Sequence, residues 1–181
     1  MNLKLEKEKK LEKNIKEFIK IIGAEGEDII ETPKRSANAW LELLNGYTQD
    51  DKLFYKTFKT DNKNLVIVKN IEFTSFCEHH LMPFQGVITM GYIPEGEVLG
   101  LSKFGRIVDC FAKRLQIQEK LTSEIGNSLI KNLKVKDIFV ISRATHSCIS
   151  CRGVRKQNAE AISFFTAGKF KNYNEFDLLK I

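Results

Sequence analysis

The first third of the chain alternates apolar and polar side chains at helical spacing. Between residues 3 and 22, apolar positions recur every three or four residues with lysine and glutamate between them, which predicts an amphipathic helix. A break rich in glycine and acidic residues follows. Thr32 and Pro33 then favour a second helix with Thr32 as its N-cap, and Asn45-Gly46 favours the end of that helix.

Beyond a polar segment at 49–63, which we expect to be a loop, the pattern changes to runs of β-branched and aromatic residues. Such runs are typical of strands, and four are expected: Leu65–Val68, Ile71–Ser75, Phe84–Ile93 and Asp137–Ser150. Helical spacing returns between the last two runs and predicts helices over about 103–114 and 118–133. This order of elements predicts an α+β fold, with helices on one face of a mainly antiparallel sheet.

The two predicted helices between the strands carry a clear apolar stripe. The residues expected to face the core are Ile107, Val108, Phe111, Leu121, Ile125, Leu129 and Leu133. We divide the chain into an N-terminal helical region, 1–50, and a second region, 51–181, and expect the two to form a single folded unit.

Size and composition indicate one substantial domain. The chain has 181 residues, of which 43% are apolar and 29% charged, as in ordinary soluble globular proteins. Its apolar runs are far shorter than the ~20 residues needed to cross a bilayer, and its start lacks the order of a signal peptide. We therefore expect a cytoplasmic protein with no membrane association. The net charge of +6 favours an anionic partner, although lysines on solvated faces would give the same value.

Cysteine and histidine occur close together in two places. The first is Cys77-Glu78-His79-His80, followed by Leu81-Met82-Pro83. A cysteine and a histidine three residues apart can meet on one side of a tight turn, but not on one face of an extended strand. In a cytosolic chain, cysteines are metal ligands or buried thiols more often than disulfides. This segment therefore predicts a turn that presents two metal ligands.

The second place holds Cys148 and Cys151. If the strand that begins at Asp137 continues through it, alternation puts His146, Cys148 and Arg152 on one face and Cys151 on the other. The two places lie far apart in the sequence, so a shared metal site requires the fold to bring them together.

Three interpretations follow from the spacing. In an open site, Cys77, His80 and Cys148 hold zinc and leave a fourth position for water, which is the catalytic pattern. In a closed structural site, Cys151 is the fourth ligand. In the third interpretation the cysteines bind no metal and are buried as small apolar residues. Strand alternation argues against Cys151 as a ligand, but spacing alone leaves all three interpretations open.

Other polar residues favour the open site. His79 and His146 are the only other histidines, and imidazoles beside a metal suit acid–base catalysis near neutral pH, although each could have a packing role. Ser102, Lys103 and Arg106 place a hydroxyl and two cations near a helix start, where free amide groups favour phosphate.

Two charged residues complete the candidate set. Arg152 adds a third cation on the expected face of Cys148. Glu119 lies at the start of the helix expected over 118–133, where an acid commonly stabilises the helix dipole. Its carboxylate could instead accept two hydrogen bonds from a guanine edge.

Together these segments resemble the GTP cyclohydrolase I family. The motifs occur in the same order and with the same spacing as in that family, across about residues 14–170. The segments that carry the resemblance are Phe76–Gly86, Gly100–Lys103 with Arg106, Arg114–Thr122, and His146–Cys148 with Arg152 and Gly153. The resemblance implies the tunnelling fold, in which an antiparallel sheet with helices on one side is closed into a barrel by subunits associating in rings. It also implies a homo-oligomer, typically a decamer of two pentamers, with active sites at subunit interfaces.

The implied reaction converts GTP and water to 7,8-dihydroneopterin triphosphate and formate, the first step of pterin and tetrahydrofolate biosynthesis. The implied cofactor is one zinc ion per subunit, held by Cys77, His80 and Cys148. By the same resemblance, Cys151 falls outside the coordination shell. No organic cofactor is implied.

The resemblance also assigns roles to the remaining residues. His146 would protonate the imidazole nitrogen as the ring opens, and His79 would handle protons during ribose opening and rearrangement. Glu119, with Gln118 nearby, would hold the pyrimidine edge of guanine. The charged members of the remaining contacts would bind the triphosphate, and Arg35 would reach in from a neighbouring subunit. These remaining implied substrate contacts are Leu101, Ser102, Lys103, Arg106, Arg152 and Arg35.

Two departures from the family pattern bear on GTP binding. Asn38 stands where many members carry a lysine that could contact phosphate. The segment 158–166 is more apolar than the family's Thr/Ser-rich strand, which bears on the interface or on substrate affinity rather than on the zinc chemistry.

Three rival functions remain. One is a non-enzymatic zinc module that binds nucleic acid, but the basic residues are scattered rather than interleaved with aromatics, so we expect no nucleic-acid partner. A second is another tunnelling-fold enzyme acting on a pterin or deazapurine. The third is a paralogue that binds GTP without turning it over.

Overall fold

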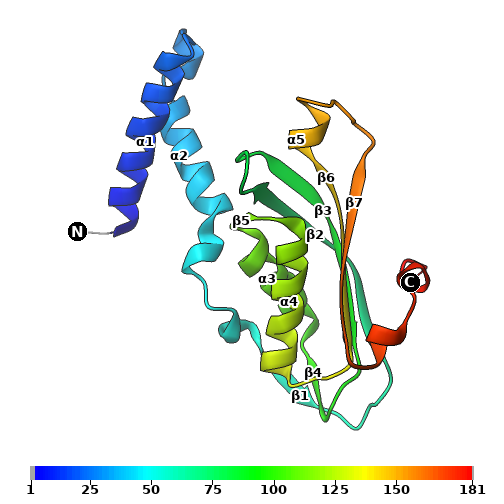
Figure 1. Ribbon diagram of the computed structural model, residues 1–181. Helices are drawn as coiled ribbons and strands as arrows, with labels where there is room; N and C mark the ends of the chain where they lie inside the picture. Colours follow the sequence, from blue (N-terminus) through cyan, green and yellow to red (C-terminus); the bar gives the residue numbers. More distant parts are fainter. Residues whose placement is uncertain (1–2, 181) are drawn as a thin grey trace. The chain divides into compact units, whose positions relative to one another are not determined.

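The computed structural model describes residues 3–180 and forms two compact units that divide after Asn45 (Figure 1). Within 3–180, no helix combines the length and the apolar character needed to cross a membrane.

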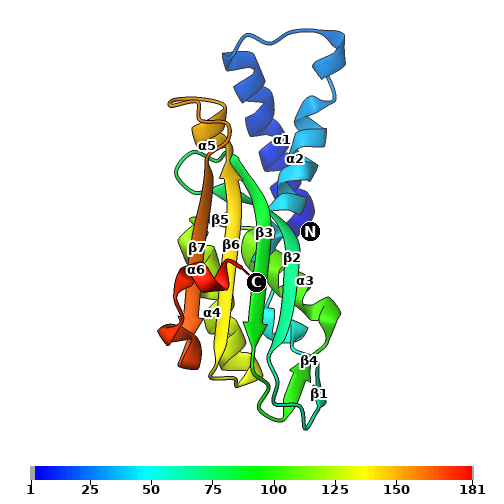
Figure 2. The ribbon, with the colours of Figure 1, turned by 90° about the vertical axis from the view of Figure 1, so that its right-hand side faces the viewer.

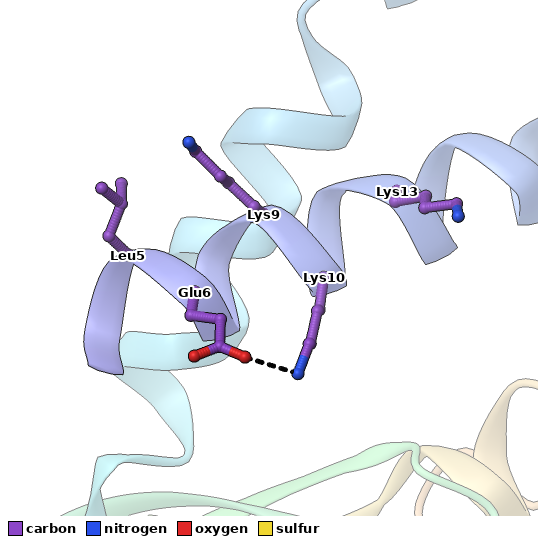
Figure 3. A pocket seen from close by; sticks show the side chains of 5 residues that line it. All are labelled: Leu5, Glu6, Lys9, Lys10 and Lys13. Carbon is purple, nitrogen blue, oxygen red and sulfur yellow. Dashed lines mark hydrogen bonds and ion pairs between the residues drawn. The ribbon is translucent and has the colours of Figure 1, made fainter. Parts of the chain in front are cut away.

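The first unit is a pair of packed helices, α1 (Leu3–Ile21) and α2 (Thr32–Leu43), joined through the short 3-10 helix η1 (Glu27–Ile29). Both predicted helices are confirmed. The predicted cap is wrong by one residue, because Glu31 occupies the N-cap position and makes no side-chain capping bond. A shallow hollow on α1 is lined by its own side chains, and Lys10 Nζ lies 2.7 Å from Glu6 Oε1 there (Figure 3). This hollow is a solvated, charged helix face.

The second unit contains the strands and the remaining helices. Its strands are β1 (Thr57–Lys59), β2 (Val66–Cys77), β3 (Pro83–Tyr92), β4 (Glu97–Leu99), β5 (Leu115–Gln116), β6 (Ile138–His146) and β7 (Glu160–Ala167). Its α-helices are α3 (Leu101–Ala112), α4 (Gln118–Leu133), α5 (Ser147–Ser150) and α6 (Glu175–Leu178). Three 3-10 helices complete it: η2 (Asn45–Thr48) at the unit boundary, η3 (Asp51–Phe54) and η4 (Gly168–Asn172).

Five strands form one curled sheet in the order β5-β2-β3-β6-β7. All neighbours are antiparallel except β2 and β5, which pair in parallel, and β1 and β4 form a separate two-stranded ribbon. Helices α3 and α4 lie on one face of this sheet (Figure 1). Figure 2 shows the other face, where α6 lies in front of the sheet. The predicted α+β class is confirmed.

The main core lies between the sheet and the two long helices. All seven residues expected to face the core on α3 and α4 are buried, which confirms the buried faces predicted from the helical periodicity. A smaller cluster on the other face joins Phe139 and Ile141 of β6 to Phe170 and Leu178. This smaller cluster covers part of the second face of the sheet.

Two predictions in the segment 49–75 need correction. The runs expected at 65–68 and 71–75 form one strand, β2, with a bulge between Val68 and Ile71 where Asn70 adopts a φ of 57°. The segment expected to be a loop at 49–63 contains η3 and β1. Short, mostly polar elements of this kind carry too little apolar periodicity to be recognised.

Candidate metal centre

A tight turn at the end of β2 brings Cys77 and His80 to the same side. The Cys77 carbonyl accepts hydrogen bonds from the amides of His80 (3.3 Å) and Leu81 (2.9 Å), and the Cys77 amide donates to Met82 O (2.9 Å). The chain reverses at Leu81, whose backbone φ of 55° is a left-handed conformation that residues other than glycine rarely adopt. The turn expected in this segment is confirmed.

Cys148 comes from a helical turn rather than from a strand. The strand predicted over 137–150 ends at His146, and the next four residues form α5. The alternation argument that placed Cys151 on the opposite strand face is therefore wrong. Cys151 does not belong to the group of converging ligand atoms described below, and its exposed Sγ donates to Ser147 O at 2.8 Å.

Three potential ligand atoms converge at this end of the sheet. One ligand atom each from Cys77, His80 and Cys148 lies within 4.8 Å of the other two, and Cys77 Sγ lies 3.9 Å from His80 Nδ1. Tetrahedral zinc with ordinary bond lengths would separate a sulfur from a nitrogen by about 3.6 Å. Cys77 is buried, Cys148 half-buried and His80 exposed, so the group is open to solvent on one side.

The electrostatics of the two thiols also fit a cation. Burial raises the pKa of the Cys148 thiol, and the neighbouring Cys77 raises it further, because two adjacent thiolates repel each other. A bound metal ion would remove this repulsion and allow both to ionise. Sulfur and imidazole nitrogen are the donors that zinc prefers. The residues present therefore fit zinc.

The two further histidines lie beside this group. His79 Nδ1 is 3.7 Å from Cys77 Sγ, and the rings of His79 and His80 are 6.3 Å apart. His146 stacks on Phe84 with a centroid distance of 4.6 Å and parallel planes. Burial lowers the pKa of His146, against an opposing effect of the Glu119 carboxylate. Burial therefore favours the neutral form of His146.

The start of α4 lies against the same end of the sheet. Glu119 is exposed there and acts on His146 through its charge. Lys120 Nζ lies 3.5 Å from Glu78 Oε2 and so links α4 to the Cys77–His80 turn. Gln118 differs from its neighbours, since its side chain is buried and hydrogen-bonded within the protein, to His146 among others. Its substrate contact stays a prediction.

The predicted cations are not all brought to this end. Arg152 is exposed and close enough to Cys148 to affect its pKa. Arg35 is exposed on α2 of the first unit. The remaining predicted substrate contacts, all at the start of α3, are Leu101, Ser102, Lys103 and Arg106.

The start of α3 lies at the other end of the second unit. This helix begins directly after β4 and ends just before β5, which pairs with Phe76 and Cys77. Its 12 residues span about 18 Å. In Figure 1, β4 and α5 accordingly lie at opposite ends of the sheet. The α3 residues and the Cys77–His80–Cys148 group therefore do not meet within one chain.

Three residues of the site were missed by the sequence reasoning. Phe84 supports the His146 ring from the paired position on β3, and Thr122 and Ser142 form a buried hydrogen bond of 2.7 Å beneath Gln118. Thr122 stands four residues after Gln118, a helical spacing that could have signalled a shared face. Ser142 and Phe84 depend on strand register, which the sequence does not reveal.

Fold and site together define a class of protein: an α+β domain with a Cys₂His group of potential metal ligands at one end of its sheet, beside two more histidines. Comparison with known proteins narrows this class. A family model described as GTP cyclohydrolase I matches residues 11–178. The chain is therefore an enzyme of the GTP cyclohydrolase I family.

Individual relatives agree over most of the chain. GTP cyclohydrolase 1 of Wolinella succinogenes is 42% identical over 165 residues, covering 89% of this chain and 88% of the relative. GTP cyclohydrolase 1 of Clostridium kluyveri is 41% identical over 172 residues, covering 93% of each. A solved structure, archaeosine synthase QueF-Like in the apo form, is similar with a TM-score of 0.48 and 19% identity, over 57% of this chain and 93% of that one.

The ligand set can be tested with two neighbouring cysteines. We expect Cys148→Ala to weaken zinc binding by more than about 100-fold, since even residues outside the coordination shell cost 10–100-fold when replaced. Cys151→Ala should retain the wild-type zinc content, because the Cys151 thiol is bonded to Ser147 O instead. Zinc per chain and zinc affinity are measured on purified protein. Equal loss in both variants would indicate a closed four-ligand site.

Proposed function

We propose that this chain opens the imidazole ring of GTP at a zinc centre and yields 7,8-dihydroneopterin triphosphate and formate, the first step of pterin and tetrahydrofolate biosynthesis. The observation that carries the proposal is the convergence of Cys77, His80 and Cys148 beside two further imidazoles. Membership of the GTP cyclohydrolase I family supports the choice of substrate.

In this proposal Cys77, His80 and Cys148 hold the zinc ion. When bound, zinc supplies Lewis-acid chemistry that lowers the pKa of water toward neutrality. The exposed side of the three-residue group leaves room for water and substrate.

The protein's own groups then move the protons. Burial lowers the pKa of His146 and so favours its neutral form, which can take up a proton from the attacking water and return it to the purine nitrogen as the ring opens. His79 is exposed beside Cys77 and serves the later ribose steps.

Recognition of GTP falls to charged residues around this group. Glu119 is exposed, with its carboxylate free to accept two hydrogen bonds from the guanine edge. Arg152 contributes a cation to the triphosphate. Ser102, Lys103 and Arg106 supply the remaining charge and hydroxyl at the start of α3.

The separation of these residues supports an active site shared between subunits. The start of α3 and the zinc ligands of a single chain lie at opposite ends of the second unit, which favours a site completed by a neighbouring subunit. The sheet also has open edges: among the described strands β7 pairs with β6 alone, and β5 covers only the end of β2. We propose that subunits join their sheets into the barrel of the tunnelling fold, as a decamer of two pentamers.

The activity is tested by incubating zinc-loaded protein with GTP. We expect equal amounts of formate and of a product that becomes a fluorescent pterin on oxidation. Formate is assayed enzymatically and the pterin by fluorescence. Zinc-loaded, folded protein that binds GTP but releases no formate would contradict the proposal and indicate the non-catalytic paralogue.

The shared site is tested by mixing two defective subunits. We expect Lys103→Ala and His146→Ala each to lower the turnover of GTP by about 100-fold or more. In mixed oligomers, about a quarter of the sites would combine an intact His146 with an intact Lys103 from the neighbour, so activity should partly return. The subunits carry different tags, which verify that mixed oligomers form. Verified mixed oligomers with no recovered activity would show that both residues act within one chain.

A further inference from the structure

Near the metal centre, both ends of the Gln118 side-chain amide are hydrogen-bonded within the protein. It is buried, with 2% of its surface exposed, at the first position of α4. Its Nε2 lies 3.1 Å from Ser142 O, 3.1 Å from Ser142 Oγ and 3.0 Å from Ala161 O. Its Oε1 lies 2.8 Å from His146 Nε2. The amide therefore connects α4 to β6, β7 and the imidazole.

These contacts determine which way the amide points. Ser142 O and Ala161 O are backbone carbonyls and can only accept hydrogen bonds, so the NH₂ end of Gln118 must face them. The carbonyl end then faces His146 and can only accept. His146 must donate from Nε2, so the neutral ring carries its proton on Nε2 and has its lone pair on Nδ1.

The surroundings hold this arrangement in place. Thr122 Oγ1 lies 2.7 Å from Gln118 O and 2.7 Å from Ser142 Oγ, so the hydroxyls beneath the amide are themselves bonded. Phe84 stacks on the His146 ring and fixes its plane. Among the described residues, no hydrogen-bond partner is found for His146 Nδ1, which leaves that atom to react.

We propose that Gln118 is a positioning residue, which holds His146 with its proton on Nε2 and so makes Nδ1 the atom that exchanges protons with the substrate. This role rests on the proposed function and replaces the guanine contact expected for Gln118. Nδ1 takes one proton from the water whose oxygen adds to the purine ring, Nε2–H stays bonded to Gln118, and the same proton passes from Nδ1 to the purine nitrogen as the ring opens. At the end of the cycle the His146 ring is again neutral, with its proton on Nε2.

The protonation of the ring is measured directly by solid-state ¹⁵N NMR of zinc-loaded protein labelled at histidine, at a pH where His146 is neutral. The chain has three histidines, so a His146→Ala sample assigns the signals. We expect a protonated Nε2 and an unprotonated Nδ1 for His146. A protonated Nδ1, or equal populations of the two forms, would overturn the proposal. Because GTP is not needed, this result is independent of whether GTP is the substrate.

Kinetics separate positioning from guanine binding. Gln118→Met keeps the length of the side chain but accepts no hydrogen bond of comparable strength, and we expect kcat to fall about 10- to 100-fold with KM for GTP changed less than about threefold. The neighbouring Glu119→Gln variant serves as the contrast and should raise KM. A raised KM with unchanged kcat in Gln118→Met would assign Gln118 to the substrate instead.

A second pair of variants perturbs the network without touching His146. Thr122→Val removes the hydroxyl that bonds Ser142 and should lower kcat and reduce the proportion of the Nε2–H form. Thr122→Ser restores the hydroxyl and should recover both. Equal effects of the two substitutions on kcat and on the NMR signals would contradict the proposal.

Discussion

The site depends above all on the register of one strand, β3, between β2 and β6. Pairing of Ser75 with Phe84, and of Phe84 with His146, aligns the end of β2 with the end of β6. The two ligand-bearing turns follow directly after these positions. A shift of one residue would turn every side chain of β3 to the opposite face, removing both the stack beneath His146 and the buried core residues Ile88 and Met90. Packing of the core therefore fixes the strand register that aligns the two ligand-bearing turns.

Much of the fold and the ligand types could be predicted from the sequence, because they depend on local patterns. The apolar stripe of α4 identified its buried face, and Cys77 with His80 identified a ligand turn. The sequence could not reveal that the strand through His146 ends there, since the runs before and after it are both rich in residues that strands accept. Nor could it reveal that Gln118 is buried, because a polar residue at a helix start is usually solvated.

The residues of the second unit that are assigned to GTP divide into two groups by position. Those that would meet the purine lie at the Cys77 end of the sheet, and those at the start of α3 lie at the other end. In the proposed assembly a chain supplies half of one site and half of another, so catalysis is coupled to association. The Gln118 network lies at the same end of the sheet as the first group and within one chain, and would therefore be complete before assembly.

The central claim is that two thiolates and one imidazole hold zinc and leave a position for water. X-ray absorption spectroscopy at the zinc edge of the zinc-loaded protein measures this shell directly. The account predicts two sulfurs at about 2.3 Å, one imidazole nitrogen at about 2.0–2.1 Å, and one further light atom that is not imidazole. A shell of three sulfurs, which would require Cys151, or a shell without sulfur would contradict it.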